Sequence, residues 1–200
     1  MNPLTRLIRW LGEPGRLRRR ARRTADAHER ASLLLRAATL ADDAAIHLEA
    51  AVALAQAGRH AEAAESWRRA IQLRPLLIPA EAQLAALAPV LPRVAHEVLD
   101  GLSRAPMSKR HWKLERRGSL DGEERWRIEQ EVHWTFAELL PTLRYVASTV
   151  AHTTGAPGRL RIDCDRLERD GEDDDRLLQM GEAVFTWDET RQITGVRVHE

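Results

Sequence analysis

The apolar residues of this chain follow one spacing before residue 108 and another after it. Up to residue 107 they recur every three or four positions, the period of an amphipathic α-helix. From residue 108 several segments alternate apolar and polar residues, the period of a half-buried β-strand. The change of period predicts a mainly α N-terminal half, residues 24–107, followed by an α+β domain, residues 108–200. A basic segment, residues 1–23, precedes both.

Three helices are expected in the first part of the helical half, over residues 24–40, 44–57 and 61–73. Their ends carry the residue types that helix ends need. Thr24 or Asp26 is positioned to cap the first helix, and Asp42 or Asp43 the second, because short polar side chains accept the free N–H groups of a first turn. Gly58 follows the second helix as a residue that tolerates a left-handed backbone. A proline at position 75 prevents the third helix from continuing.

Small residues mark the predicted contact between the helices 44–57 and 61–73. Ala51, Ala63 and Ala70 stand on the faces where a core usually has leucine. Alanine lets two helix axes approach closely, and the bulk of Trp67 fills the space beside them. The sequence therefore predicts a tight antiparallel helical hairpin.

With Ala44 as its first residue, the segment 44–77 resembles a tetratricopeptide repeat of 34 residues. Ala51 and Leu54 match the first helix, Gly58 the turn, and Ala63, Trp67, Ala70 and Pro75 the second helix and its end. His47 and Ala50 stand where the repeat has tryptophan and leucine. The helix before this segment resembles the second half of such a repeat, with Ala31, Leu35 and Ala38 in the places of Ala63, Trp67 and Ala70. After the segment, two short helices broken by Pro89 and Pro92 are expected. The resemblance covers residues 24–103 and implies a scaffold that binds other proteins.

In that family the inner surface of the first helix contacts the ligand. By this resemblance the expected partner-binding residues are Ala45, Leu48, Glu49, Val52 and Gln56. Their small and aliphatic side chains are suited to a helix or an extended peptide. One repeat cannot bury its own faces, so another part of the chain or another protein must cover them.

The C-terminal half predicts strands and one helix in the order β-β-α-β-β-β. In residues 124–134, Trp126, Ile128, Val132 and Trp134 alternate with charged residues, and residues 135–152 form an amphipathic helix. We expect an antiparallel sheet with this helix across one face, in which the strand tryptophans, Trp112 and Trp187 included, pack in the core. Stacking on nucleic-acid bases is the alternative role for them. The acidic run 163–175 predicts a solvated loop between two of these strands, because an EF-hand register would place Arg166 at a ligand position.

The motifs of common enzyme classes are not found in the sequence. It has no HExxH pair, no glycine-rich phosphate loop and no GxSxG elbow, and its single cysteine, Cys164, lies in an expected strand. We therefore expect no catalytic residue, no metal and no cofactor, with an unrecognised enzyme in the C-terminal domain as a less favoured alternative. Arginine replaces lysine almost everywhere, which suggests a GC-rich bacterial genome.

The N-terminal segment suggests a second function. Leu4, Leu7, Ile8 and Leu11 share one helical face beside Trp10, and Gly12, Pro14 and Gly15 are expected to end that helix after about two turns. A basic stretch follows this helix. The candidate residues for contact with a polyanion or a membrane are Leu7, Ile8 and Trp10 of the helix and Arg18, Arg19, Arg20, Arg22 and Arg23 of the basic stretch. An anionic membrane, a nucleic acid, and simple packing on the neighbouring helices remain the three interpretations.

These observations lead to one main hypothesis and one alternative. The main one is a non-enzymatic adaptor or assembly factor that grips another protein. The alternative is a membrane-surface or nucleic-acid-associated regulator that acts through residues 1–23. The net charge of +1 argues against a chain built as a whole to coat nucleic acid. No apolar run approaches the roughly 20 residues that span a bilayer, so we expect a cytoplasmic location, or a peripheral one at the inner membrane face.

Overall fold

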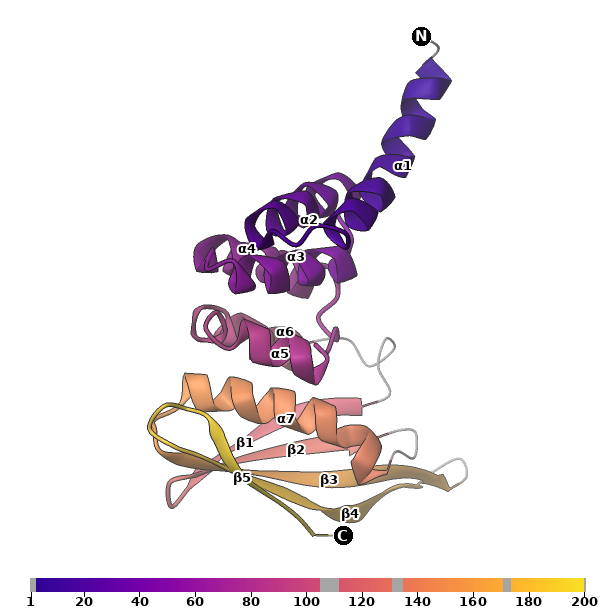
Figure 1. Ribbon diagram of the computed structural model, residues 1–200. Helices are drawn as coiled ribbons and strands as arrows, with labels where there is room; N and C mark the ends of the chain where they lie inside the picture. The colour runs from indigo at the N-terminus through magenta and orange to yellow at the C-terminus, as the bar shows by residue number, and fades with distance from the viewer. Residues whose placement is uncertain (1–2, 105–111, 131–134, 171–173, 200) are drawn as a thin grey trace. The chain divides into compact units, whose positions relative to one another are not determined.

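A computed structural model describes residues 3–104, 112–130, 135–170 and 174–199, without the side chains of residues 3–11, 166–170 and 174–179. The described chain divides into two compact units, Met1–Val94 and Ala95–Glu200. The first unit is helical and the second is a five-stranded sheet with helices, so the expected fold class, helices followed by an α+β domain, is confirmed (Figure 1).

The first unit consists of helices that pack pairwise along the chain. They are α1 (Pro3–Ala21), α2 (Ala27–Ala41), α3 (Ala44–Gln56), α4 (His60–Leu73) and α5 (Glu81–Leu87), followed by the 3-10 turn η1 (Leu91–Arg93). α1 packs on α2, α2 on α3, and α3 on both α4 and α5. Because only short turns join α2, α3 and α4, these neighbours run antiparallel (Figure 1). Such an arrangement is compatible with a helical repeat.

The helix ends confirm the capping signals of the sequence. The carboxylate of Asp26 accepts the N–H of His28 at 2.8 Å at the start of α2. The carboxylate of Asp43 accepts the N–H groups of Ala45 and Ile46 at the start of α3, at 3.0 and 3.1 Å. Gly58 follows α3 with φ at +73°, a left-handed conformation that costs glycine nothing.

α1 is longer than the sequence predicts. Gly12, Pro14 and Gly15 were expected to end the helix, yet it continues through all three to Ala21. Proline removes one backbone hydrogen bond and glycine lowers helix propensity, but packing against α2 offsets both costs. The prediction of a two-turn helix was wrong because it considered local propensity alone.

The second unit begins with α6 (Ala95–Arg104), which packs against α7 (Phe136–Thr153) and β1. Its sheet contains β1 (Trp112–Leu120), β2 (Glu123–Gln130), β3 (Gly158–Asp170), β4 (Asp174–Trp187) and β5 (Ile193–His199), paired in sequence order. Thr135 caps α7, because its Oγ1 accepts the N–H of Glu138 at 3.4 Å, and its own N–H donates in return to Glu138 Oε2 at 2.8 Å. α7 lies across one face of the sheet and contacts β3, β4 and β5 (Figure 1).

The sheet is mixed rather than antiparallel throughout. β1–β2, β3–β4 and β4–β5 pair antiparallel as expected, whereas β2 and β3 pair in parallel, with Trp126 opposite Ile162 and Ile128 opposite Cys164. Two neighbouring strands joined by a helical crossover run in the same direction, and α7 is that crossover.

The acidic run 163–175 contains mostly strand instead of the expected loop. β3 and β4 form a long hairpin in which Asp170 pairs with Asp174, and residues 171–173 are outside the described residues. Backbone ladder hydrogen bonds thus extend through a sequence whose composition is typical of a loop.

The tryptophans whose side chains the structure describes lie in the cores, as predicted. Trp67 in the first unit and Trp112, Trp126 and Trp187 in the second are each 5% exposed or less. Trp134 lies outside the described residues. The interpretation of the three described strand tryptophans as a platform for stacking nucleic-acid bases is therefore wrong.

Candidate functional site

The five residues expected to contact a partner all lie in α3, but they differ in exposure. Ala45 and Gln56 are exposed, Val52 is half-buried, and Leu48 is only 4% exposed. Glu49 is half-buried and engaged in an ion pair. The surface that α3 offers is therefore narrower than the sequence suggests, because Leu48 belongs to the core.

Glu49 is held by an arginine from α1. Arg18 donates from Nε to Glu49 Oε2 at 3.0 Å and from Nη2 to Glu49 Oε1. This hydrogen-bonded contact raises the pKa of the Arg18 guanidinium, so the guanidinium stays charged at all ordinary pH values. These two hydrogen bonds anchor α1 beside the residues expected to contact a partner, and sequence spacing did not predict them.

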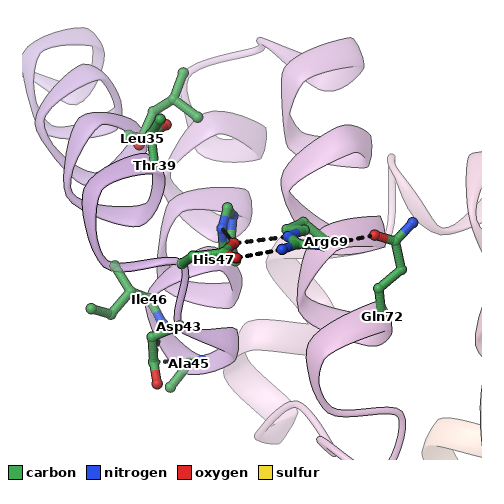
Figure 2. A network of polar contacts seen from close by, with 9 residues as sticks. Leu35, Thr39, Asp43, Ala45, Ile46, His47, Arg69 and Gln72 are labelled. Carbon is green, nitrogen blue, oxygen red and sulfur yellow. Dashed lines mark hydrogen bonds and ion pairs between the residues drawn. The ribbon is translucent and has the colours of Figure 1, made fainter.

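A polar network fixes the junction between α2, α3 and α4 (Figure 2). Asp42 ends α2 in the left-handed conformation, with φ at +49°, and its carboxylate faces α4. Arg69 of α4 donates from Nε to Asp42 Oδ1 at 2.8 Å and from Nη2 to Oδ2. The Nε2 of His47 in α3 lies 3.3 Å from the same carboxylate, and Arg69 also reaches Gln72 (Figure 2). One carboxylate thereby ties three helices together.

This network lowers the pKa of Asp42. The hydrogen bond from Arg69 is the main cause, and the contact with His47 acts in the same direction. Asp42 is consequently ionised throughout the neutral range. The turn that leads into α3 is therefore held to α4 by a charged Asp42–Arg69 contact that persists at physiological pH.

The face of α3 turned toward α4 is packed through small residues. Ala51 and Ala63 are 0% exposed, Ala70 is 1% exposed, and Trp67 is 1% exposed beside them. The close approach predicted from the alanines is confirmed. Because α3 is held by α2, α4 and α5, it presents its remaining face as a rigid surface.

The arginines of the basic segment fall into two groups. Arg18 pairs with Glu49, and Arg20 pairs with Glu29 at 2.6 Å. Arg19, Arg22 and Arg23 are exposed, as is Arg16, and they form no ion pair with any described side chain. The side chains of Leu7, Ile8 and Trp10, the apolar members of the predicted site, lie outside those that the structure describes.

A depression of about 390 Å³ lies in the second unit, bordered by α6, β1, β2 and α7. Trp126 and Glu124 belong to its lining and are both buried. Arg116 donates to Glu124 at 3.0 Å from Nε and at 2.8 Å from Nη2. The negative charge of Glu124 and the positive charge of Arg116 at the depression therefore balance each other. Sequence reasoning did not find this place, because residues from four separate elements form it.

A network of ion pairs lies on the sheet face opposite α7. Glu123 is 8% exposed and accepts Arg159 at 3.0 Å and Arg161 at 3.1 Å. Arg161 continues to Glu182 at 2.7 Å. Alternating charges along the strands were the sequence signal for this face, and the structure shows that they pair across strands.

The single cysteine of the chain lies in the core of the second unit. Cys164 is fully buried in β3, and burial raises the pKa of its thiol to about 12, which suppresses the nucleophilic thiolate. Among these side chains, no group of three or more histidine, cysteine, aspartate or glutamate residues is arranged to hold a metal. No helix within the described residues is long and apolar enough to cross a membrane.

Comparisons with protein-family models, with curated proteins and with solved structures found no match to this chain.

Proposed function

We propose that the chain is a non-enzymatic protein–protein interaction adaptor whose helical unit binds a segment of another protein along α3. The observation that carries this proposal is a helix held on several sides that still presents exposed residues. α3 is fixed by the Asp42–Arg69 contact at its start and by buried alanines toward α4, while Ala45 and Gln56 remain exposed. A rigid surface loses little conformational entropy on binding.

The chemistry of this surface suggests the kind of partner segment. Ala45 and Val52 offer small, aliphatic contacts, and Gln56 adds a side chain that both donates and accepts hydrogen bonds. Such a surface accommodates an amphipathic helix or an extended peptide that brings its own large apolar side chains. Glu49 is already bound by Arg18, so it borders the site instead of supplying a free charge.

Site-specific photocrosslinking in the native host tests this placement. A benzophenone amino acid is introduced at Ala45 or Gln56, and at Ala61 as the control, because Ala61 is an exposed alanine in α4. We expect the same partner to be cross-linked from both α3 positions and not from position 61. Cross-links that are equal from all three positions would refute the assignment of the partner to α3.

A substitution supplies the matching loss of function. Ala45→Arg adds a long charged side chain to the proposed contact, and Ala61→Arg adds the same side chain to α4. We expect Ala45→Arg alone to prevent co-purification of the cross-linked partner, with circular dichroism unchanged in both variants. Retained binding in Ala45→Arg would contradict the proposal.

A second candidate function is a regulator that acts at a polyanionic surface. It is favoured by the exposure of Arg16, Arg19, Arg22 and Arg23 without described acidic partners. Charges that are exposed and unpaired attract an oppositely charged surface at low ionic strength. This role uses α1 and is independent of the α3 face.

A further inference from the structure

We propose that α1 is a peripheral docking helix for an anionic lipid surface. The proposal rests on the second candidate function and specifies its partner. It begins from the length of α1, which is one continuous helix from Pro3 to Ala21. The N-terminal half of this helix extends away from α2, α3 and α4, whereas its C-terminal half lies beside them (Figure 1).

The described polar contacts of α1 come from its C-terminal part. Glu13 accepts Arg36 of α2, Arg18 binds Glu49 of α3, and Arg20 binds Glu29 of α2. Ala21 is 1% exposed at the end of the helix. These contacts fix the direction in which the rest of α1 projects.

The sequence of the projecting part has four apolar residues at helical spacing. Leu4, Leu7, Ile8 and Leu11 occupy positions that share one face of an uninterrupted helix. The sequence places Arg6 and Arg9 away from that face. A helix with this division of residues lies in the plane of a membrane interface, with its apolar face among the acyl chains.

The charge of the following turns supplies the preference for anionic lipid. Arg16, Arg19, Arg22 and Arg23 are exposed, and no described acidic side chain neutralises them. Arginines three or four positions apart on a helix repel one another. Anionic headgroups would relieve that repulsion, and each arginine near such a surface raises the partition coefficient about fivefold.

The apolar stripe distinguishes lipid from nucleic acid. Phosphate groups of a nucleic acid would engage the arginines but would leave Leu4, Leu7, Ile8 and Leu11 in water. A lipid surface engages both groups at once, because Arg16 and Arg19 lie in the same helix as the apolar residues and Arg22 and Arg23 directly follow its end. The geometry therefore favours lipid as the partner.

Vesicle flotation with the full chain tests the proposal. Vesicles of phosphatidylcholine with about a third phosphatidylglycerol are compared with vesicles of phosphatidylcholine alone, at low salt. We expect binding to the anionic vesicles only. Replacing Arg16, Arg19, Arg22 and Arg23 by glutamine should lower the partition coefficient several-hundredfold, about fivefold for each charge.

A control variant removes the same number of charges elsewhere. Arg74, Arg93, Arg191 and Arg197 are exposed and lie outside α1, so glutamine at these four positions gives the same net charge. The control should retain most of the binding. A second test variant, Leu7→Ser with Ile8→Ser, keeps every charge and should lower binding by tenfold or more. Circular dichroism and thermal unfolding establish that each variant is folded.

Four outcomes would overturn the lipid proposal. The first is no binding to anionic vesicles at low salt, and the second is an equal loss in the control variant. The third is tight binding to duplex DNA that Leu7→Ser with Ile8→Ser leaves intact, which would preserve the polyanion role with a different partner. The fourth is self-association in sedimentation that the same serine variant abolishes, which would assign the stripe to a second copy of the chain.

Discussion

Arg18 in α1 donates two hydrogen bonds to Glu49 in α3, across 31 positions of the chain. The two side chains are 31% and 30% exposed, so water screens this pair less than it screens a pair on the open surface. The contact links the basic segment to the helix that we propose as the partner surface.

Glu49→Gln should therefore lower the free energy of unfolding by about 1 kcal/mol, because it removes the charge but keeps the shape. Urea unfolding measures the change. Arg18→Gln should have a similar effect, and the double variant should cost less than the sum of the two. Fully additive effects would show that the two side chains do not interact in solution.

Asp42 makes the stability of the first unit depend on pH. Arg69 holds the pKa of this carboxyl below its usual value in the folded chain. A carboxyl whose pKa is lower in the folded chain than in the unfolded chain is protonated more readily in the unfolded chain. Its stabilising contribution is therefore fully present above the pKa of the unfolded chain, about 3.9, and is lost as the pH falls through the pKa of the folded chain.

Asp42→Asn should consequently be less stable than the natural chain at pH 7, and the difference should disappear in acid, below the lowered folded pKa. Asparagine keeps the left-handed backbone accessible, so the substitution isolates the charge. Thermal unfolding across this pH range measures the difference. A gap between the two proteins that does not change with pH would mean that the charge of Asp42 is not responsible.

Because α3 and α4 pack through alanines, the same substitution should have different effects on stability at two nearby positions of α4. Ala63 is fully buried and Ala61 is exposed, although both lie in α4. Ala63→Leu should cost about 1–3 kcal/mol because the helices must separate, whereas Ala61→Leu should change stability by less than about 0.5 kcal/mol. Chemical denaturation of the two variants measures both values, and equal effects would contradict close packing at Ala63.

Gly158 begins β3 where the indole of Trp187 covers the backbone. A methyl group on Gly158 would come within 2.8 Å of Trp187 Nε1, and closer to the ring carbons, while that N–H donates to the carbonyl of Gly155 at 3.3 Å. Gly158→Ala should therefore destabilise the second unit by about 1–3 kcal/mol.

Gly155→Ala provides the matched control, because nothing lies within 4 Å of a methyl group at that position. Tryptophan fluorescence during unfolding distinguishes the two variants. Similar unfolding midpoints for both would show that Trp187 does not cover Gly158 in solution.

Local signals in the sequence accounted for most of the fold. Asp26, Asp43 and Gly58 act at helix ends as predicted, since caps depend on residues only a few positions apart. The continuation of α1 past Pro14 was missed because contacts with α2 decide it. The parallel pairing of β2 with β3 was also missed, although the helix between two adjacent strands was the available signal.

The candidate site was harder to predict than the fold. Helical periodicity placed Ala45 to Gln56 on α3, but it could not show that Leu48 is buried. The Arg18–Glu49 and Asp42–Arg69 contacts each join residues far apart in the sequence. No local spacing rule finds such pairs, because the angle at which two helices pack determines them.

The crossover through α7 has a consequence for the order of folding. Adjacent antiparallel strands, β1 with β2 and β3 with β4 and β5, are close along the chain and lose little entropy when they meet. The parallel pairing of β2 with β3 requires a longer segment of chain, including all of α7, to be ordered between the two strands. We therefore expect the antiparallel pairs to form early and the β2–β3 pairing to form late, so a substitution that destabilises α7 should slow the final step more than the earlier ones.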